Sequence, residues 1–580
     1  MIFGRISKAY FPFGLIFLFC LLFFSAAGQN GQPYSSSNST PEDVQFESDT
    51  TKKVIIDSTD VLRFEDGVRQ LVGNVILRQG DAMMFCDSAA IKDNNVNAFG
   101  NVILQQGDSI FVFSDTLVYI GETRKATLFG EVRLTDSIQI LETNKLDYDL
   151  NERVGTYQDS ATLTHQELGT RLTSKKGYYY VSTKEAFFRE NVEVIDSNYT
   201  LQADTLKIDT ETNVTHFVGP TYIQTKENDI YCEAGFYDTR NNYAEFEQNA
   251  RLEKDDQIIE ADKIRYDGEE DLAYIDGRSQ VSDKGRTIDS DNAFYDAGEK
   301  VSKFRGNVII RDSAQTIESD SVDYFSDLDL SIAMGNVVLF DEEEDLKVES
   351  EYAEYNNDSG YLKASGRPLV TNLIDTDTLW LAADTLFSYK VDSIDARILI
   401  AQNDVRVFKS DLQSICDSLV YSTVDSTFRF LQTPVMWTDS TQFSADTMTV
   451  FLVDKQINNI FMDQNAFIIN TGDEVFFNQI KGRDIEAFFI DNELRRMDVQ
   501  GNGESVYYLL DDIDAYVGVN KTICSEMLVY FGSNEVEQIN FYTQPKATVY
   551  PMGKANHASL QMAGFQWLLS KKPKGKDDLR

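Results

Sequence analysis

A short sequence pattern returns about every 29 residues between Lys52 and Tyr550, and this repetition limits the possible folds more than any other feature. Each copy of such a repeat builds one small unit, which buries its apolar face only by stacking on its neighbours. Successive copies start at residues 73, 100, 130, 159, 190, 219, 248, 277, 306, 335 and 366, and continue near 403, 433, 464 and 501. The longer steps at 366–403 and 464–501 predict insertions within the array.

Each repeat has two halves. One half reads Gly-Asn-Val-x-Leu and stands at Gly73–Leu77, Gly100–Leu104, Gly306–Ile310 and Gly335–Leu339, with weaker copies at Gly130–Leu134, Glu190–Val194 and Asn403–Val407. The other half reads small-Asp-x-apolar-x-Tyr and stands at Ser114–Tyr119, Ala261–Tyr266, Ser319–Tyr324 and Cys416–Tyr421. Apolar residues alternate with period two in both halves, so each half is predicted to be a strand.

Composition agrees with an extended, well-paired sheet. The chain has only 9 prolines, which cannot donate to a strand ladder, whereas Phe and Tyr, which suit pleated surfaces, number 38 and 28. Gly and Asn at the strand entrance supply the backbone angles that a tight corner needs. We therefore predict an all-β fold of stacked, cornered strands, with no helix beyond the N-terminal segment.

The two ends of the chain differ from the array. Residues 1–28 carry Arg5 and Lys8, an apolar stretch and small residues, which is typical of a secretory signal peptide. Residues 29–51 are polar and are predicted to be a flexible linker before the array at 52–550. Residues 551–580 form a C-terminal tail. Its Lys-rich end, residues 571–580, is predicted to be a disordered, solvated segment, with contact to anionic lipid headgroups or to a partner as the alternative.

No catalytic or metal-binding pattern stands out, so we expect neither an enzyme nor a cofactor or metal site. The three histidines, His165, His216 and His557, lack carboxylates at ligand spacing. The recurring aspartates are predicted to form hydrogen bonds at the corners rather than a calcium ladder: Asp87, Asp115, Asp204, Asp262, Asp320, Asp384, Asp417 and Asp446. A formal net charge of −41 opposes binding to nucleic acid.

The exported chain has four cysteines, spaced more than a hundred residues apart, which does not suggest a disulfide scaffold. Cys86, Cys232 and Cys416 take the small-residue position of the second motif, and Cys524 stands one place before it. We expect all four to be small buried side chains.

The tandem motifs resemble the OstA-like repeats of the LptA family and of the N-terminal domain of the LptD family, over about residues 52–550. The chain looks like the longer OstA-like proteins of the Bacteroidota. The resemblance implies an open β-jellyroll, two facing sheets with an apolar interior, located in the periplasm or associated with the outer membrane. It also implies lipopolysaccharide or a related glycolipid as cargo. Its expected partners are inner-membrane and outer-membrane transport components, joined end to end by strand addition.

The inward residues of the Gly-Asn-Val-x-Leu strands are the predicted lipid-groove residues: Val75, Leu77, Val102, Leu104, Val132, Leu134, Val308, Ile310, Val337 and Leu339. A closed core requires the same apolar face, so a structural or adhesive β-solenoid is an open alternative. A scaffold or plug for a separate outer-membrane barrel is a second alternative. A solenoid enzyme is the least favoured, because no cluster of carboxylates or basic residues interrupts the repeat on one face.

Overall fold

The computed structural model describes residues 53–580, with gaps at 109, 136–138, 167–168, 210, 227, 284, 314, 343–344, 357–358, 375–376, 392–395, 454–455, 491–492 and 533–534. The predicted signal peptide and linker lie outside the described residues. Within them the chain forms 42 strands, one short helix, α1 (His557–Leu560), and the 3-10 turns η2 (Ser326–Leu328), η3 (Met552–Lys554), η4 (Leu569–Lys571) and η5 (Lys576–Asp578). The all-β prediction is confirmed, but the expectation of no helix beyond the N-terminal segment is wrong at α1, where the Asn556 side chain caps a single turn by accepting from Ser559 N. None of the helices in this part of the chain has the length and apolar character needed to cross a membrane.

The chain divides into two compact units. The N-terminal unit comprises the described residues up to 284 together with Asn292–Glu299, and the C-terminal unit comprises Gly285–Asp291 and Lys300–Arg580. Strand β20 (Arg286–Asp296) contributes one half to each unit. The array boundaries at 52 and 550 stay a prediction.

The N-terminal unit contains β1 (Ile55–Ser58), β2 (Val61–Glu65), β3 (Val68–Gln79), β4 (Ala82–Lys92), β5 (Asn95–Gln106), β6 (Ile110–Ile120), β7 (Lys125–Thr135), β8 (Gln139–Asp149), β9 (Val154–Tyr157), β10 (Ala161–His165), β11 (Arg171–Ser174), β12 (Lys176–Tyr180), β13 (Glu185–Ile195), β14 (Tyr199–Asp209), β15 (Val214–Thr225), β16 (Asp229–Asp238), β17 (Tyr243–Lys254), β18 (Gln257–Asp267) and β19 (Leu272–Asp283).

The C-terminal unit contains β21 (Val301–Arg311), β22 (Gln315–Phe325), β23 (Leu330–Asp341), β24 (Leu346–Asn356), β25 (Tyr361–Ser365), β26 (Leu369–Ile374), β27 (Asp377–Ala382), β28 (Thr385–Val391), β29 (Ala396–Lys409), β30 (Leu412–Ser422), β31 (Thr427–Leu431), β32 (Val435–Thr438), β33 (Thr441–Ser444), β34 (Thr447–Val453), β35 (Gln456–Asp463), β36 (Phe467–Asn470), β37 (Asn478–Lys481), β38 (Asp484–Ile490), β39 (Glu493–Leu510), β40 (Tyr516–Gly532), β41 (Glu535–Tyr542) and β42 (Lys546–Pro551).

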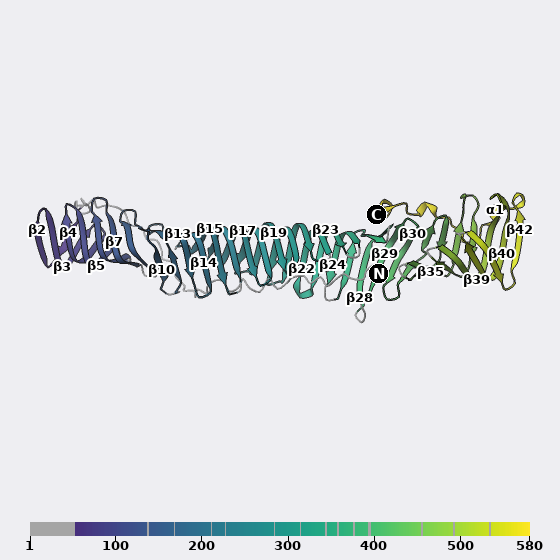
Figure 1. Ribbon diagram of the computed structural model, residues 1–580, viewed down its shortest axis with the longest axis horizontal. Helices are drawn as coiled ribbons and strands as arrows, with labels where there is room; N and C mark the ends of the chain where they lie inside the picture. Colours follow the sequence, from purple (N-terminus) through teal and green to yellow (C-terminus); the bar gives the residue numbers. More distant parts are fainter. Residues whose placement is uncertain are drawn as a thin grey trace, which may run out of the picture. The chain divides into compact units, whose positions relative to one another are not determined.

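Long strands that follow one another in the chain, such as β4, β5 and β6, pair antiparallel and lie side by side within each unit (Figure 1). Where a bent strand is split into two short ones, each short strand pairs with the neighbouring repeat, as β25 does with β28 and β26 with β27. A repeat is therefore two long strands joined by tight turns, as in β5 and β6. Residues 95–99 of β5 pair with 116–120 of β6, and residues 102–106 pair with 110–114. The two halves of each strand thus belong to two facing sheets, and the strand bends between them.

The bend lies inside the strand. The sequence had predicted a corner at the entrance of the strand, and this position is wrong. Gly100 and Asn101 take φ values of 74° and 45°, and the ladder skips both residues. This is a β-bulge, which lets a strand turn sharply without losing its partners on either side. The same pair of left-handed residues recurs in β3, β7, β21 and β23, at Gly73–Asn74, Gly130–Glu131, Gly306–Asn307 and Gly335–Asn336.

Aspartates of the second motif hold these bends in place. Asn101 Nδ2 donates to Asp87 Oδ2 over 2.8 Å, and Asn336 Nδ2 donates to Asp320 Oδ2 over 3.0 Å. Asn465 makes the same bond to Asp446 over 3.0 Å. For these three aspartates, the predicted role in corner hydrogen bonding is confirmed.

The C-terminal tail folds back over the C-terminal unit, so the prediction of a disordered end is wrong. Leu560 and Met562 pack on Phe467, Ile469 and Val506, on the outer face of β36 and β39. The Gln442 side chain makes two hydrogen bonds to the tail backbone. Its Nε2 donates to Gln566 O over 2.7 Å, and its Oε1 accepts from Leu568 N over 2.8 Å.

The end of the tail is anchored in the same manner. Leu579 is fully buried against Leu369 and Ala382, and Arg367 Nη2 donates to Leu579 O over 2.7 Å. Residues 556–580, the strap, therefore cover an outer sheet face that apolar side chains would otherwise expose.

Candidate functional site

The apolar interior between the facing sheets is the candidate site. Nine of the ten predicted groove residues are buried: Val75, Leu77, Val102, Leu104, Val132, Leu134, Val308, Ile310 and Val337. Leu339 is half-buried and packs against the same interior. All ten therefore line the inside of the fold, and their contact with a lipid stays a prediction.

In part of the N-terminal unit the interior is filled by aromatic rings. One row of inward residues crosses neighbouring strands in register: Phe188, Leu206, Phe217, Gly235, Phe246, Ile264 and Ile275. The rings of Phe217 and Phe246 stack with centroids 6.1 Å apart across Gly235. Here the interior is a closed core.

In the C-terminal unit the equivalent row loses its large side chains. It begins with Phe304 and Val322, passes through Ala333, Ala353 and Ala364 on three adjacent strands, and ends at Leu386. Ala353 stands where the second motif has Leu117, Ile264 or Val322. Three neighbouring alanines remove the atoms that would otherwise fill this layer.

A cavity of about 60 Å³ lies at this alanine run. Three predicted groove residues, Ile310, Val337 and Leu339, line it. The other lining residues are Gln315, Ile317, Val322, Ser331, Ala333, Val348, Ser350, Ala353, Tyr355, Leu362 and Ala364. The volume exceeds the roughly 10–15 Å³ that one water needs, but a water also needs two or more polar partners. A cavity lined mainly by apolar side chains instead suits an apolar guest.

One polar group in the cavity wall lacks a hydrogen-bond partner. Ser331 is 6 % exposed, and within the described part of the chain no group accepts from or donates to its Oγ. A buried hydroxyl without a partner costs free energy, on the order of 1–3 kcal/mol. A guest with an oxygen atom next to its apolar chain would satisfy this hydroxyl.

Sequence reasoning identified the large residues of the cavity wall and missed the small ones. The signal was the loss of the usual Leu at Ala353, combined with Ala333 in the facing strand. These two substitutions are unremarkable singly, and only the strand register places them side by side.

The remaining reactive side chains are dispersed. His165, His216 and His557 lie on β10, β15 and α1, and no group of three or more potential metal ligands occurs among the described residues. The four cysteines are free and buried, as expected. Burial raises the pKa of the Cys86 thiol to about 11 and that of Cys232 to about 12. These thiols are therefore protonated and unreactive near neutral pH.

The fold and its interior define a class: a β-jellyroll repeat protein, built from bulged antiparallel strands, whose facing sheets enclose an apolar interior. Residues 51–204 and 209–320 match the model of the family described as OstA-like protein. Over these residues the chain is similar to the OstA-like family.

Among solved structures, the chain is similar to LptH from Pseudomonas aeruginosa, described as the LptA homologous periplasmic component of the conserved lipopolysaccharide transport device. The two are 21 % identical, the match covers 19 % of this chain and 80 % of LptH, and the TM-score is 0.17. No curated protein matches the sequence.

Proposed function

We propose that this protein is a periplasmic lipid-binding bridge that carries lipopolysaccharide or a related glycolipid between the inner and outer membranes in its apolar interior. The observation that carries the proposal is the cavity at Ala333, Ala353 and Ala364, bounded by predicted groove residues. The match to the model of the OstA-like family over residues 51–204 and 209–320 supports it.

The cavity chemistry fits the acyl part of such a lipid. Every methylene kept from water contributes about 0.8 kcal/mol, so an apolar slot between two sheets can hold an acyl chain while the sugars stay in water. The hydroxyl of Ser331 would donate to an ester or hydroxyl oxygen near the head of the chain. The remaining length of the chain would occupy the interior between neighbouring repeats.

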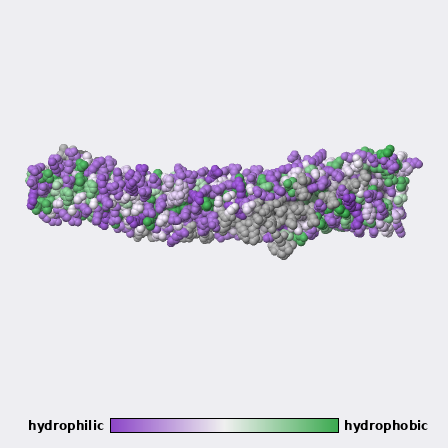
Figure 2. Space-filling model, viewed as in Figure 1, coloured by the Kyte–Doolittle hydropathy of each residue, from purple (hydrophilic) through white to green (hydrophobic). Residues whose placement is uncertain are grey.

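The terminal strands suit the end-to-end partners that a bridge requires. Within the described residues, β2 pairs only with β3, and its Leu62 and Phe64 are 56 % and 74 % exposed. Figure 2 shows apolar surface gathered over this end of the N-terminal unit. An open edge with apolar side chains is suited to strand addition by a partner.

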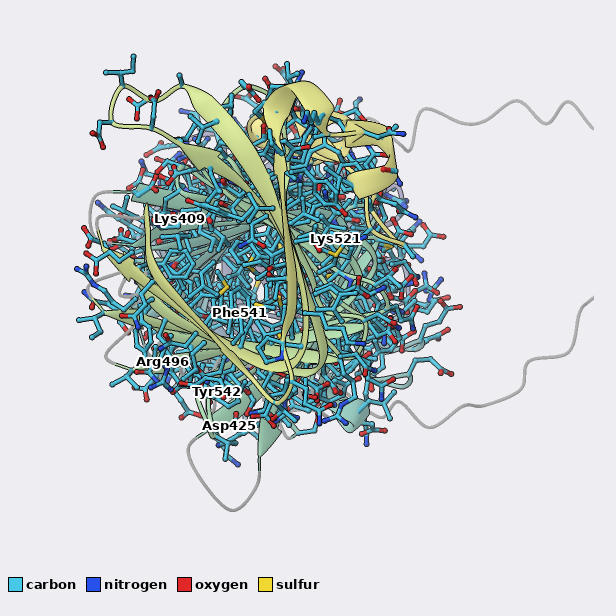
Figure 3. All side chains as sticks on the ribbon, turned by 90° about the vertical axis from the view of Figure 1, so that its right-hand side faces the viewer. Lys409, Asp425, Arg496, Lys521, Phe541 and Tyr542 are labelled. Carbon is cyan, nitrogen blue, oxygen red and sulfur yellow. The ribbon has the colours of Figure 1, made fainter. Side chains whose placement is uncertain are left out.

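The last strands of the C-terminal unit also leave the interior accessible. Phe541 of β41 points inward and is only partly buried against the core, whereas Tyr542 points away from it (Figure 3). A partner that adds strands here would continue the apolar interior. We assign inner-membrane and outer-membrane transport components to these two ends.

A structural β-solenoid with a closed core is the second candidate. The phenylalanine row from Phe188 to Phe246 favours it, because that layer has no room for a lipid without rearrangement. A scaffold for an outer-membrane barrel would share the same fold and differ in its partner.

Filling the cavity separates these candidates. Ala353→Leu restores the side chain usual at this position and is expected to weaken binding of fluorescently labelled lipopolysaccharide to the purified protein at least tenfold. Thr316→Leu adds an apolar side chain to the outer face of β22 and is the control, expected to bind as the unmodified protein does. Equal binding by both variants would reject the cavity as the lipid site and favour the structural role.

A further inference from the structure

The turns between strands form two lips that face each other across the interior of the N-terminal unit. The first lip consists of the turns at 93–94, 121–124 and 150–153, and the second includes the turns at 80–81 and 107–108. A jellyroll whose lips stand apart can receive a ligand from the side. Joined lips restrict the ligand to the ends.

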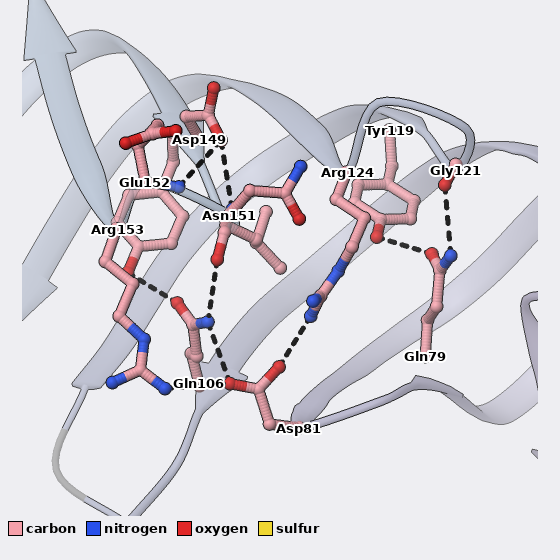
Figure 4. A network of polar contacts seen from close by, with 12 residues as sticks. Gln79, Asp81, Gln106, Tyr119, Gly121, Arg124, Asp149, Asn151, Glu152 and Arg153 are labelled. Atoms are coloured by element: carbon pink, nitrogen blue, oxygen red, sulfur yellow. Dashed lines mark hydrogen bonds and ion pairs between the residues drawn. The ribbon is translucent and has the colours of Figure 1, made fainter. Parts of the chain in front are cut away.

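Asp81 on the second lip binds two arginines of the first lip. Its carboxylate lies 2.5 Å from Arg124 and 3.2 Å from Arg153, at sequence separations of 43 and 72 residues (Figure 4). Burial acts against its charged form, but hydrogen bonds from Gln106 and Arg124 outweigh it and lower the pKa of Asp81. The carboxylate is therefore charged at neutral pH and holds both cations.

Two buried glutamines join the lips directly. Gln79 Nε2 donates to Gly121 O over 3.0 Å, and Gln79 Oε1 accepts from the Tyr119 hydroxyl over 2.5 Å. Gln79 is 3 % exposed, so these bonds lie in the interior and not on the surface.

Gln106 repeats this arrangement one repeat later. Its Nε2 donates to Leu150 O over 3.1 Å and to Asp81 over 2.9 Å, and its Oε1 accepts from the Tyr148 hydroxyl over 2.7 Å. Gln106 is 4 % exposed. The ion pairs of Asp81 and the bonds of Gln106 thus form one network between the two lips, and the bonds of Gln79 form a second set beside it.

Stability alone does not require this network. Apolar side chains at positions 79 and 106 would continue the core with no polar group to satisfy, whereas a buried amide is costly unless every partner is in place. Partial opening of such a network would leave buried polar groups without hydrogen-bond partners, which costs free energy. We therefore expect the network to be either fully formed or fully open.

We propose that Asp81, Gln79, Gln106 and their partners on the first lip form a latch that closes the groove over residues 79–153. This section is an enclosed conduit, through which the acyl chains of the proposed cargo pass lengthwise. Side entry requires the latch to open. The inference rests on the proposed function for its cargo, but the closure itself can be measured without any lipid.

Cys86 provides a natural reporter of closure. It lies on β4 inside the latched section, 6 % exposed, and its side chain faces the interior. Cys232, in the same unit but outside the section, and Cys416, in the C-terminal unit, are equally buried internal controls.

The experiment measures alkylation of these thiols by a maleimide in the full-length protein, followed by mass spectrometry of each cysteine peptide. Asp81→Ala, and separately Arg124→Met with Arg153→Met, are expected to accelerate alkylation of Cys86 at least tenfold and to leave Cys232 and Cys416 unchanged. Asp57→Ala removes a comparable pair, to Arg78 at 2.9 Å, that joins neighbouring strands, and is expected to change none. An unchanged Cys86 rate in both latch variants, with circular dichroism of folded protein, overturns the latch.

A second arm adds labelled lipopolysaccharide to the same variants. Faster loading of Asp81→Ala than of the unmodified protein supports the conduit, and equal loading despite faster Cys86 alkylation overturns it. If no variant binds the lipid while Cys86 still accelerates, the proposed function fails and the latch stands.

Discussion

At the scale of single residues, each bend requires a glycine, an asparagine and an aspartate, and each of the three has a different role. Gly100 permits the left-handed backbone, Asn101 donates to Asp87, and Asp87 lies where a side chain on residue 100 would be. A Cβ on Gly100 would come within 2.5 Å of Asp87 Oδ2. The motif Gly-Asn opposite Asp is therefore a set of coupled requirements and not a loose preference.

This coupling predicts a non-additive pair of substitutions. Gly100→Ala is expected to reduce the free energy of unfolding by about 1–3 kcal/mol through backbone strain, and by more through the clash with Asp87. In an Asp87→Ala background the same change should cost less, because the clash is gone and only the strain remains. Urea unfolding of the four proteins measures this, and strictly additive effects would contradict the coupling.

The sequence predicted which large side chains face the interior, but it did not predict where the interior contains a cavity. Alternation placed Val102 and Leu104 inside correctly, because period two fixes the face of every residue in a strand. The cavity at Ala353 could not be predicted, since a void depends on which small residues meet across strands, and this depends on register.

At the scale of elements, the strap is the main departure from the predicted fold. Its lysines suggested a solvated end, but Leu560 and Met562 before them and Leu579 after them anchor the strap. The backbone of the strap also binds Gln442 and Gln479, which lie more than 75 residues away in sequence. No local pattern reveals such a pairing.

The hydrogen bonds from Gln442 and Gln479 to the strap backbone indicate which substitutions would loosen the strap. Gln442→Ala combined with Gln479→Ala removes the partners of Leu568 N and Met562 N. Each lost bond to a buried group costs about 1–3 kcal/mol, so hydrogen exchange at these amides should rise roughly tenfold or more. Gln500→Ala, at an exposed position on β39, is the control, and unchanged exchange in the double variant would show that the apolar contacts alone hold the strap.

At the scale of the whole molecule, the repeat determines the architecture and local departures from it determine what the interior can hold. The period predicted bent, stacked strands in both units. Yet the layer from Phe188 to Phe246 is filled, whereas the layer from Ala333 to Ala364 contains a cavity. Under the proposed function, these two sections would enclose a lipid to different degrees.

The central claim is that lipid occupies the interior, and in-cell photo-crosslinking tests it most directly. A photo-reactive residue at inward Leu339, beside the cavity, and at inward Leu104 is compared with outward controls at Val338 and Gln105, with blotting for lipopolysaccharide. Lipid adducts are expected at Leu339 and Leu104 and none at Val338 or Gln105. Folded protein without adducts at either inward position would contradict it and favour a closed structural core.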